Sequence, residues 1–187
     1  PAAAYLVSQL AASLDVQQRG EIVEKFDTAL TDSYYLNGMQ ESVERERALQ
    51  PGKPFPDFRV FDKEGKEYTL ADFRGKYLFV EFSASWCGWC KLEIPFLETV
   101  YNNTKGKDFV MFTINLDDER GKWEQDVKQH NLPWKVISDL RAFESPVARN
   151  YNVSGIPMIY LIDPDGKIKE KGLRREEMIA YINGLFD

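Results

Sequence analysis

The chain has 187 residues, which is enough for one domain with a modest attachment. Hydrophobic residues make up 43% of it and charged residues 29%, and the formal net charge is −6. This acidic balance argues against a general nucleic-acid binder, which needs a basic surface. The longest apolar runs are far below the ~18 residues of a membrane-spanning helix. We therefore expect neither nucleic-acid binding nor a membrane span in this chain.

Residues 1–51 predict a helical N-terminal extension that differs in composition from residues 52–187. They contain no Trp and only 1 of the 12 Phe. Apolar residues recur at helical spacing, and Asp15 and Gln18 form a capping pair before the second predicted helix. Residues 42–49 predict a third helix, ended by a proline. The apolar positions of the extension are Tyr5, Leu6, Leu10 and Leu14, then Ile22, Val23, Phe26, Ala29 and Leu30, and finally Tyr34, Tyr35 and Met39.

These apolar faces must dock on something, because isolated helices of this length are marginal in water. The candidates are residues 52–187, a second copy of the chain in a homodimer, or a precursor segment upstream of Pro1. We expect one of the first two, with a role in positioning partners rather than in chemistry.

Residues 52–187 alternate between strand and helix patterns. Tyr77–Ser83 is a nearly continuous apolar run, typical of a central strand covered on both faces. Ser145 and Pro146 predict a helix start, with the serine as cap. Together the patterns predict an α/β fold with a mixed central sheet, flanking helices and an N-terminal β-hairpin. The expected strands lie at 58–61, 68–70, 77–83, 109–115, around 136, 158–162 and 167–170, and the expected helices at 88–101, 119–130, from 146, and 174–185.

Both cysteines of the chain, Cys87 and Cys90, lie where the central strand gives way to a helix. A helix N-terminus presents unpaired N–H groups and a partial positive charge, which stabilise an anion. Cys87 should therefore favour the thiolate that attacks disulfides, while Cys90, one turn on, resolves the mixed disulfide. With His130 as the single histidine, a Cys/His zinc site would need a carboxylate. We expect no metal, and no cofactor beyond the redox-active Cys87–Cys90 disulfide.

The stretch Ser85–Lys91 (SWCGWCK), with Pro95 five residues after the second cysteine, resembles the thioredoxin superfamily. In finer detail it resembles the extracytoplasmic TlpA/ResA-like branch, which is similar to the AhpC/TSA group in its leading hairpin. The resemblance covers residues 54–187 and implies a thioredoxin-like fold. The other stretches that carry it are 54–58 (PFPDF), 70–76 (LADFRGK), 155–157 (GIP) and 161–168 (LIDPDGKI).

The resemblance implies roles for residues that would surround the cysteines. Pro157 occupies the position of the family's cis-proline loop, and Ile156 would offer its backbone to an extended client peptide. An ordinary trans turn is the alternative, because cis bonds are a small minority of X–Pro bonds. Trp86, Gly88 and Trp89 would line the client-binding rim, although the two tryptophans could equally pack the start of the helix.

Glu81 matches the family's buried acid behind the second cysteine, six residues before Cys87. Burial raises the pKa of a carboxyl group, and a raised pKa suits a proton acceptor for Cys90. A paired, purely structural glutamate is the alternative.

The chain also departs from the family pattern. Ser83 replaces the aromatic residue usual four positions before the first cysteine. Thr113 stands where thioredoxins keep a lysine near the buried acid, so the proton path that the resemblance implies lacks this lysine. We interpret Lys91 as a helix-surface charge and His130 as a helix-end residue.

From these residues and the resemblance we expect a thiol–disulfide oxidoreductase that acts on protein clients as a reductant and receives electrons from an upstream donor. A peroxiredoxin-type peroxidase is a second interpretation. Its motif requires Thr or Ser three residues before the cysteine and Pro seven before, where this chain has Ala84 and Val80. A third is a binding or redox-sensing module with a structural disulfide, which would not reduce insulin.

The expected location rests on the resemblance, which implies an extracytoplasmic protein of the bacterial periplasm. The chain begins at Pro1 and has no basic segment or apolar core of a signal peptide. We therefore expect either a processed product or an artificially trimmed chain, whose leader or anchor is not in this sequence.

Overall fold

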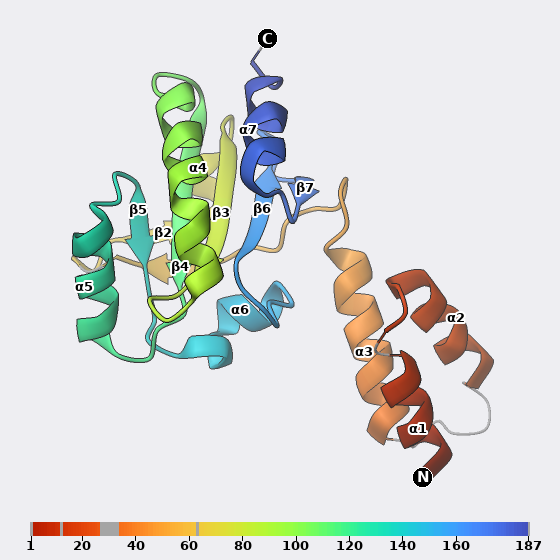
Figure 1. Ribbon diagram of the computed structural model, residues 1–187. Coiled ribbons are helices and arrows are strands. Elements are labelled where there is room, and N and C mark those ends of the chain that lie inside the picture. Colours follow the sequence, from red (N-terminus) through yellow and green to blue (C-terminus); the bar gives the residue numbers. More distant parts are fainter. Residues whose placement is uncertain (1, 12, 27–33, 63, 187) are drawn as a thin grey trace. The chain divides into compact units, whose positions relative to one another are not determined.

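The computed structural model describes residues 2–11, 13–26, 34–62 and 64–186 (Figure 1). The chain divides into two compact units, Pro1–Gln50 and Pro51–Asp187. Ala29 and Leu30, which the sequence predicts on a helical face, lie outside the described residues.

The first unit consists of helices that cover part of their own apolar faces. Asp15 and Gln18 cap the second helix as predicted, since the backbone N–H of each donates to the side chain of the other. The third helix begins at residue 34 and not at 42, because the apolar residues from Tyr34 to Met39 belong to it. The helices are α1 (Ala2–Ala11), α2 (Val16–Phe26) and α3 (Tyr34–Ala48).

A small core joins these helices to one another. Ala11, Leu36 and Met39 are buried at its centre. The sequence-based expectation, in which the apolar faces dock on residues 52–187 or on a second copy, did not include packing of these helices against one another. Partly buried residues that pack against the core are Val7, Leu14, Ile22 and Val23.

The second unit is built on a five-stranded mixed sheet with strand order β5-β4-β3-β6-β7 (Figure 1). Its first three strands in the chain, β3, β4 and β5, run parallel, whereas β6 pairs antiparallel with β3 and β7 pairs antiparallel with β6. A separate hairpin, β1 (Arg59–Phe61) and β2 (Glu67–Thr69), precedes it. The sheet strands are β3 (Tyr77–Ser83), β4 (Phe109–Asn115), β5 (Lys135–Ile137), β6 (Met158–Ile162) and β7 (Ile168–Lys171).

In the described part of the second unit four helices accompany the sheet, and α4 and α7 lie side by side against one of its faces (Figure 1). Ser145 stands at the start of α6 with Pro146 in the first helical position, as predicted. The serine hydroxyl, however, makes no capping hydrogen bond, and it is buried with no hydrogen-bond partner among the described residues. The helices are α4 (Gly88–Thr104), α5 (Arg120–His130), α6 (Pro146–Asn150) and α7 (Arg175–Asn183), with short 3-10 turns at Leu70–Phe73 and Ala142–Glu144.

The main core lies between the sheet and the α4/α7 layer. Successive residues of a strand point to opposite faces, so Phe79 and Glu81 share one face of β3 while Val80 and Phe82 share the other. On the other face Phe82 meets Tyr151, whose ring stacks on a phenylalanine. The buried residues of the α4/α7 core are Phe79, Leu97, Val100, Met111, Trp134, Ile159, Leu161, Leu173, Met178 and Ile182.

No helix within the described part of the chain is long and apolar enough to span a membrane.

Candidate active site: a cysteine pair at a helix N-terminus

The cysteine pair lies where β3 leads into α4. Cys87 is the N-cap residue of the helix and is joined to Cys90 by a disulfide. The backbone N–H of Cys90 donates to the Sγ atom of Cys87 over 3.1 Å. Both residues are buried, Cys87 at 6% and Cys90 at 2% exposure. The Cys90 N–H and the positive end of the helix thus act on the Cys87 sulfur, which favours a thiolate there once the disulfide is reduced.

Apolar side chains before, between and after the two cysteines are exposed. Trp86 is 56% exposed and Trp89 68%, and Leu92 one turn further is exposed as well. The Trp86 ring lies 6.1 Å from that of Phe143. This exposure disfavours the alternative in which the tryptophans pack the helix start. At Gly88 an added Cβ would meet no atom within 4 Å, so the backbone between the cysteines is uncovered.

The loop before β6 leads into a strand that pairs with β3, and β3 is the strand that runs into the cysteine-bearing turn. Its Ile156–Pro157 peptide bond is cis. Met158, the next residue, pairs with Phe82 near the end of β3. The guanidinium group of Arg174 donates to the carbonyl oxygen of Pro157, so the segment before α7 holds this loop.

Glu81 is a buried carboxyl group in the middle of β3, at 4% exposure. Burial raises its pKa to about 7, and the nearby charge of Glu93 adds to this rise. A hydrogen bond from Thr113 to its Oε2 atom, 2.7 Å long, and the charge of Arg174 act in the opposite direction. Among the interactions of the described residues, Glu81 makes no hydrogen bond to either cysteine.

Glu93 is a second buried acid, which the sequence analysis missed. It lies on α4, one turn after Cys90, and is 4% exposed. Its carboxylate accepts the backbone N–H of Arg175 over 3.1 Å and lies 3.7 Å from the Nε atom of that side chain. The signal was present in the spacing, because Cys90, Glu93 and Leu97 fall on one face of a helix.

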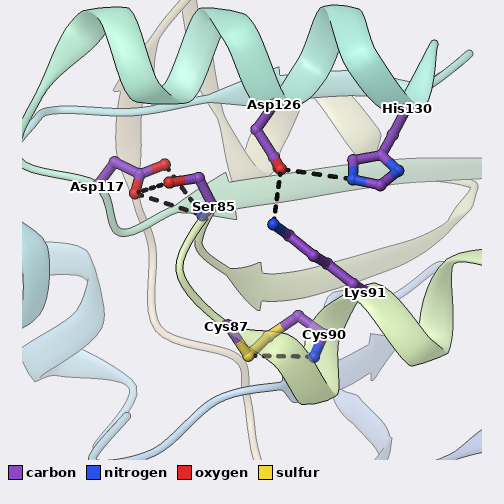
Figure 2. A network of polar contacts seen from close by, with 7 residues as sticks. All are labelled: Ser85, Cys87, Cys90, Lys91, Asp117, Asp126 and His130. Atoms are coloured by element: carbon purple, nitrogen blue, oxygen red, sulfur yellow. Dashed lines mark hydrogen bonds and ion pairs between the residues drawn. A yellow bond between two sulfur atoms is a disulfide. The ribbon is translucent and has the colours of Figure 1, made fainter.

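Lys91 is an exposed residue of α4 and His130 is the last residue of α5, as the sequence predicts, and both also contact a common acidic residue. Figure 2 shows both reaching Asp126 of α5, with its Oδ1 atom 3.7 Å from the lysine Nζ and 3.6 Å from the histidine Nε2. Asp126 therefore links the residue after Cys90 to α5. Sequence spacing alone does not show this link, because it depends on how α5 packs beside α4.

The turn before the cysteines is anchored separately (Figure 2). Asp117 is a buried acid two residues after β4, and it accepts both the Oγ–H of Ser85 at 2.7 Å and its backbone N–H at 3.1 Å. Ala84 and Val80 are also buried, and neither supplies the hydroxyl group or proline ring of a peroxidatic motif.

Comparison with known proteins agrees with this geometry. Residues 51–171 match the model of the AhpC/TSA family. The chain is 34% identical over 137 residues to thiol-disulfide oxidoreductase ResA of Bacillus cereus, an alignment that covers 72% of this chain and 78% of the relative.

Solved structures resemble the chain over a similar share of its length. The thioredoxin domain of a thiol-disulfide oxidoreductase from Bacteroides vulgatus has a TM-score of 0.67 at 29% identity, covering 74% of this chain and 99% of that one. A thiol-disulfide oxidoreductase from Bacteroides fragilis has a TM-score of 0.66 at 28% identity, covering 72% and 100%. The chain therefore belongs to the AhpC/TSA family, and within the thioredoxin superfamily it is a TlpA/ResA-like thiol–disulfide oxidoreductase.

Proposed function

We propose that this oxidoreductase reduces disulfides in protein clients, with Cys87 as the attacking thiol and Cys90 as the resolving thiol. The observation that carries the proposal is the hydrogen bond from the Cys90 N–H to the Sγ atom of Cys87. A donor aimed at one sulfur and not the other lowers the pKa of that thiol selectively. The disulfide of the pair is the only redox group that this chemistry needs.

In the first step the Cys87 thiolate attacks a client disulfide. A bond forms between Cys87 and one client sulfur, and the other client sulfur leaves as a thiolate and takes up a proton. In the second step Cys90 loses its proton and attacks the Sγ atom of Cys87. The second client sulfur is released, the Cys87–Cys90 disulfide forms, and two electrons have passed to the client. An upstream dithiol donor then returns the pair to the reduced state.

Glu81 is the proposed base for the second step. Its pKa of about 7 means that it exchanges protons near neutral pH. Since it does not hydrogen-bond to Cys90 directly, we assign the transfer to an intervening water molecule. Glu93, one turn after Cys90, helps to keep the Glu81 proton affinity high.

Exposed apolar side chains near the pair support a protein client over a small thiol. Trp86, Trp89 and Leu92 offer the surface on which an extended peptide packs, and the Ile156 backbone lies in the loop before β6. Replacing both tryptophans by serine should raise KM for insulin reduction several-fold while leaving reduction of a small aromatic disulfide unchanged. Phe61→Ser, at an exposed phenylalanine of β1, is the matched control. Equal loss on both substrates would contradict a client surface.

The low exposure of both cysteines favours one alternative, a binding or sensing module with a structural disulfide. Insulin reduction in the presence of dithiothreitol separates the two. The proposed oxidoreductase accelerates precipitation of the insulin B chain, and the Cys87→Ala variant does not. A wild-type protein no faster than that variant would favour the structural alternative.

We also propose an extracytoplasmic, periplasmic location, which rests on the family resemblance.

We further propose a homodimer formed through the first unit. Leu6, Leu10 and Tyr34 are exposed in this unit and offer an apolar contact surface. Light scattering on the whole chain tests the dimer. Wild type should have twice the monomer mass and Leu10→Gln a lower mass, whereas a monomeric wild type would contradict it.

A further inference from the structure

Three buried polar side chains form a hydrogen-bonded row across the sheet. The Nε1–H of Trp134 donates to the Oγ1 atom of Thr113 over 2.9 Å, and the Thr113 hydroxyl donates to the Oε2 atom of Glu81 over 2.7 Å. All three residues are less than 9% exposed. The row follows the strand register, since Thr113 of β4 pairs with Glu81 on one side and with Val136 of β5 on the other.

The direction of each hydrogen bond follows from donor and acceptor chemistry. An indole N–H can only donate, and a threonine hydroxyl has one proton to give. Because Trp134 donates to the Thr113 oxygen, the hydroxyl proton is left for Glu81. The hydroxyl of Thr113 is therefore a fixed donor, pointed at the carboxylate.

We propose that Trp134 and Thr113 are positioning residues that hold Glu81 as a hydrogen-bond acceptor and so set the pH at which this acid takes up and releases its proton. Its importance for catalysis rests on the proposed function, in which Glu81 is the base for Cys90. The positioning itself does not depend on that role.

The hydrogen bond from Thr113 acts against the surroundings that stabilise the protonated form of Glu81. Burial and the charges of Glu93 on α4 and Asp126 on α5 disfavour the Glu81 carboxylate. The charge of Arg174, before α7, stabilises the Glu81 carboxylate, and Thr113 donates a hydrogen bond to it directly. A donor to a carboxylate stabilises the charged form over the neutral form. Without the row, Glu81 would stay protonated at neutral pH and could not accept a proton from Cys90.

Trp134 is well placed to keep this arrangement rigid. Its ring is part of the main core and lies 5.9 Å from that of Tyr101. Removing its N–H would leave the Thr113 hydroxyl free to rotate. The effect of Trp134→Phe should thus have the same sign as that of Thr113→Val and a smaller size.

The test is a titration of the Glu81 carboxyl carbon by ¹³C NMR in the oxidised protein, with Glu81→Gln identifying the resonance. A hydrogen bond to a charged group corresponds to about one to two pH units, so Thr113→Val should move the midpoint up by that amount. Thr113→Ser, which restores the hydroxyl, should return it to the wild-type value. Thr104→Val is the matched control, because Thr104 is also buried but bonds to the Val100 carbonyl.

An unchanged or lowered midpoint in Thr113→Val would overturn the proposal. If that variant does not fold, the Trp134→Phe and Thr113→Ser titrations decide in the same way: no upward shift in Trp134→Phe would contradict it. The rate of mixed-disulfide release, measured in parallel, separates the two claims. A shifted midpoint with an unshifted release profile supports the positioning and removes Glu81 from the proposed mechanism.

Discussion

The backbone N–H of Cys90 points at the Sγ atom of Cys87, 3.1 Å away, and not the reverse. This one-way contact arises because Cys87 is the N-cap of α4 while Cys90 is already in its first turn. The positive end of the helix therefore acts on one sulfur of the pair. The two cysteines differ in chemistry although they are only three residues apart.

The first prediction concerns the order of alkylation. In single-thiol variants, Cys87 in Cys90→Ser should react with iodoacetamide faster near pH 7 than Cys90 in Cys87→Ser. The Cys87 rate should have its midpoint below the ~8.5 of an unperturbed thiol. Mass spectrometry over a pH series measures both rates. Faster labelling of Cys90 would reverse the assigned roles.

A second prediction concerns Glu81→Gln. Glutamine keeps the shape of the side chain but cannot accept a proton, so release of the client mixed disulfide at pH 7 should slow by on the order of 10²-fold. The initial attack by Cys87 should change little, because it needs no proton transfer to Glu81. Rapid-quench kinetics resolve the two steps. An unchanged pH profile of release would leave Glu81 a structural residue.

A third prediction links Glu81 to stability. Its pKa rises from 4.5 to about 7 on folding, so the folded state binds the proton more tightly than the unfolded chain. The Glu81 contribution to stability is therefore complete below pH 4.5 and is lost as the pH rises through 7. The loss should be about 3 kcal/mol in the free energy of unfolding.

Urea unfolding of wild type and Glu81→Gln between pH 4 and 8 measures this contribution as the difference between the two proteins. The free energy of unfolding of Glu81→Gln, relative to that of wild type, should increase as the pH rises. A constant difference across the range would show that Glu81 titrates as an ordinary exposed carboxyl.

A fourth prediction concerns the first unit. Residues 1–50 have their own small core, and the cysteines, Glu81 and Pro157 all belong to the second unit. Deleting residues 1–50 should leave insulin reduction measurable while lowering solubility or stability. A truncated protein that folds by circular dichroism but has no activity would show that the first unit completes the active site.

Three strands of the sheet were predictable from sequence because their apolar runs are long and nearly continuous. Tyr77–Ser83, 109–115 and 158–162 occur at the predicted residues. The start of α3 was missed because Tyr34, Tyr35 and Met39 were recognised as apolar positions but were not assigned to the predicted helix at 42–49. The cysteine pair was visible from its position alone.

The surroundings of the site depend on long-range packing and were harder to predict. The link from Lys91 to Asp126 needs α5 beside α4, which no local pattern specifies. Thr113 was noticed as a departure from the family, but its partner Trp134 lies 21 residues away. Glu93 could have been found from helical spacing, since it follows Cys90 by one turn.

The central claim is that Cys87 attacks and Cys90 resolves, and trapping of mixed disulfides tests it most directly. Cys90→Ser and Cys87→Ser, each in reduced form, are mixed with oxidised insulin, quenched with acid and analysed by non-reducing mass spectrometry. The account predicts a covalent complex through Cys87 that accumulates in Cys90→Ser and is nearly absent in Cys87→Ser. Equal trapping by the two variants, or trapping by Cys87→Ser alone, would contradict it.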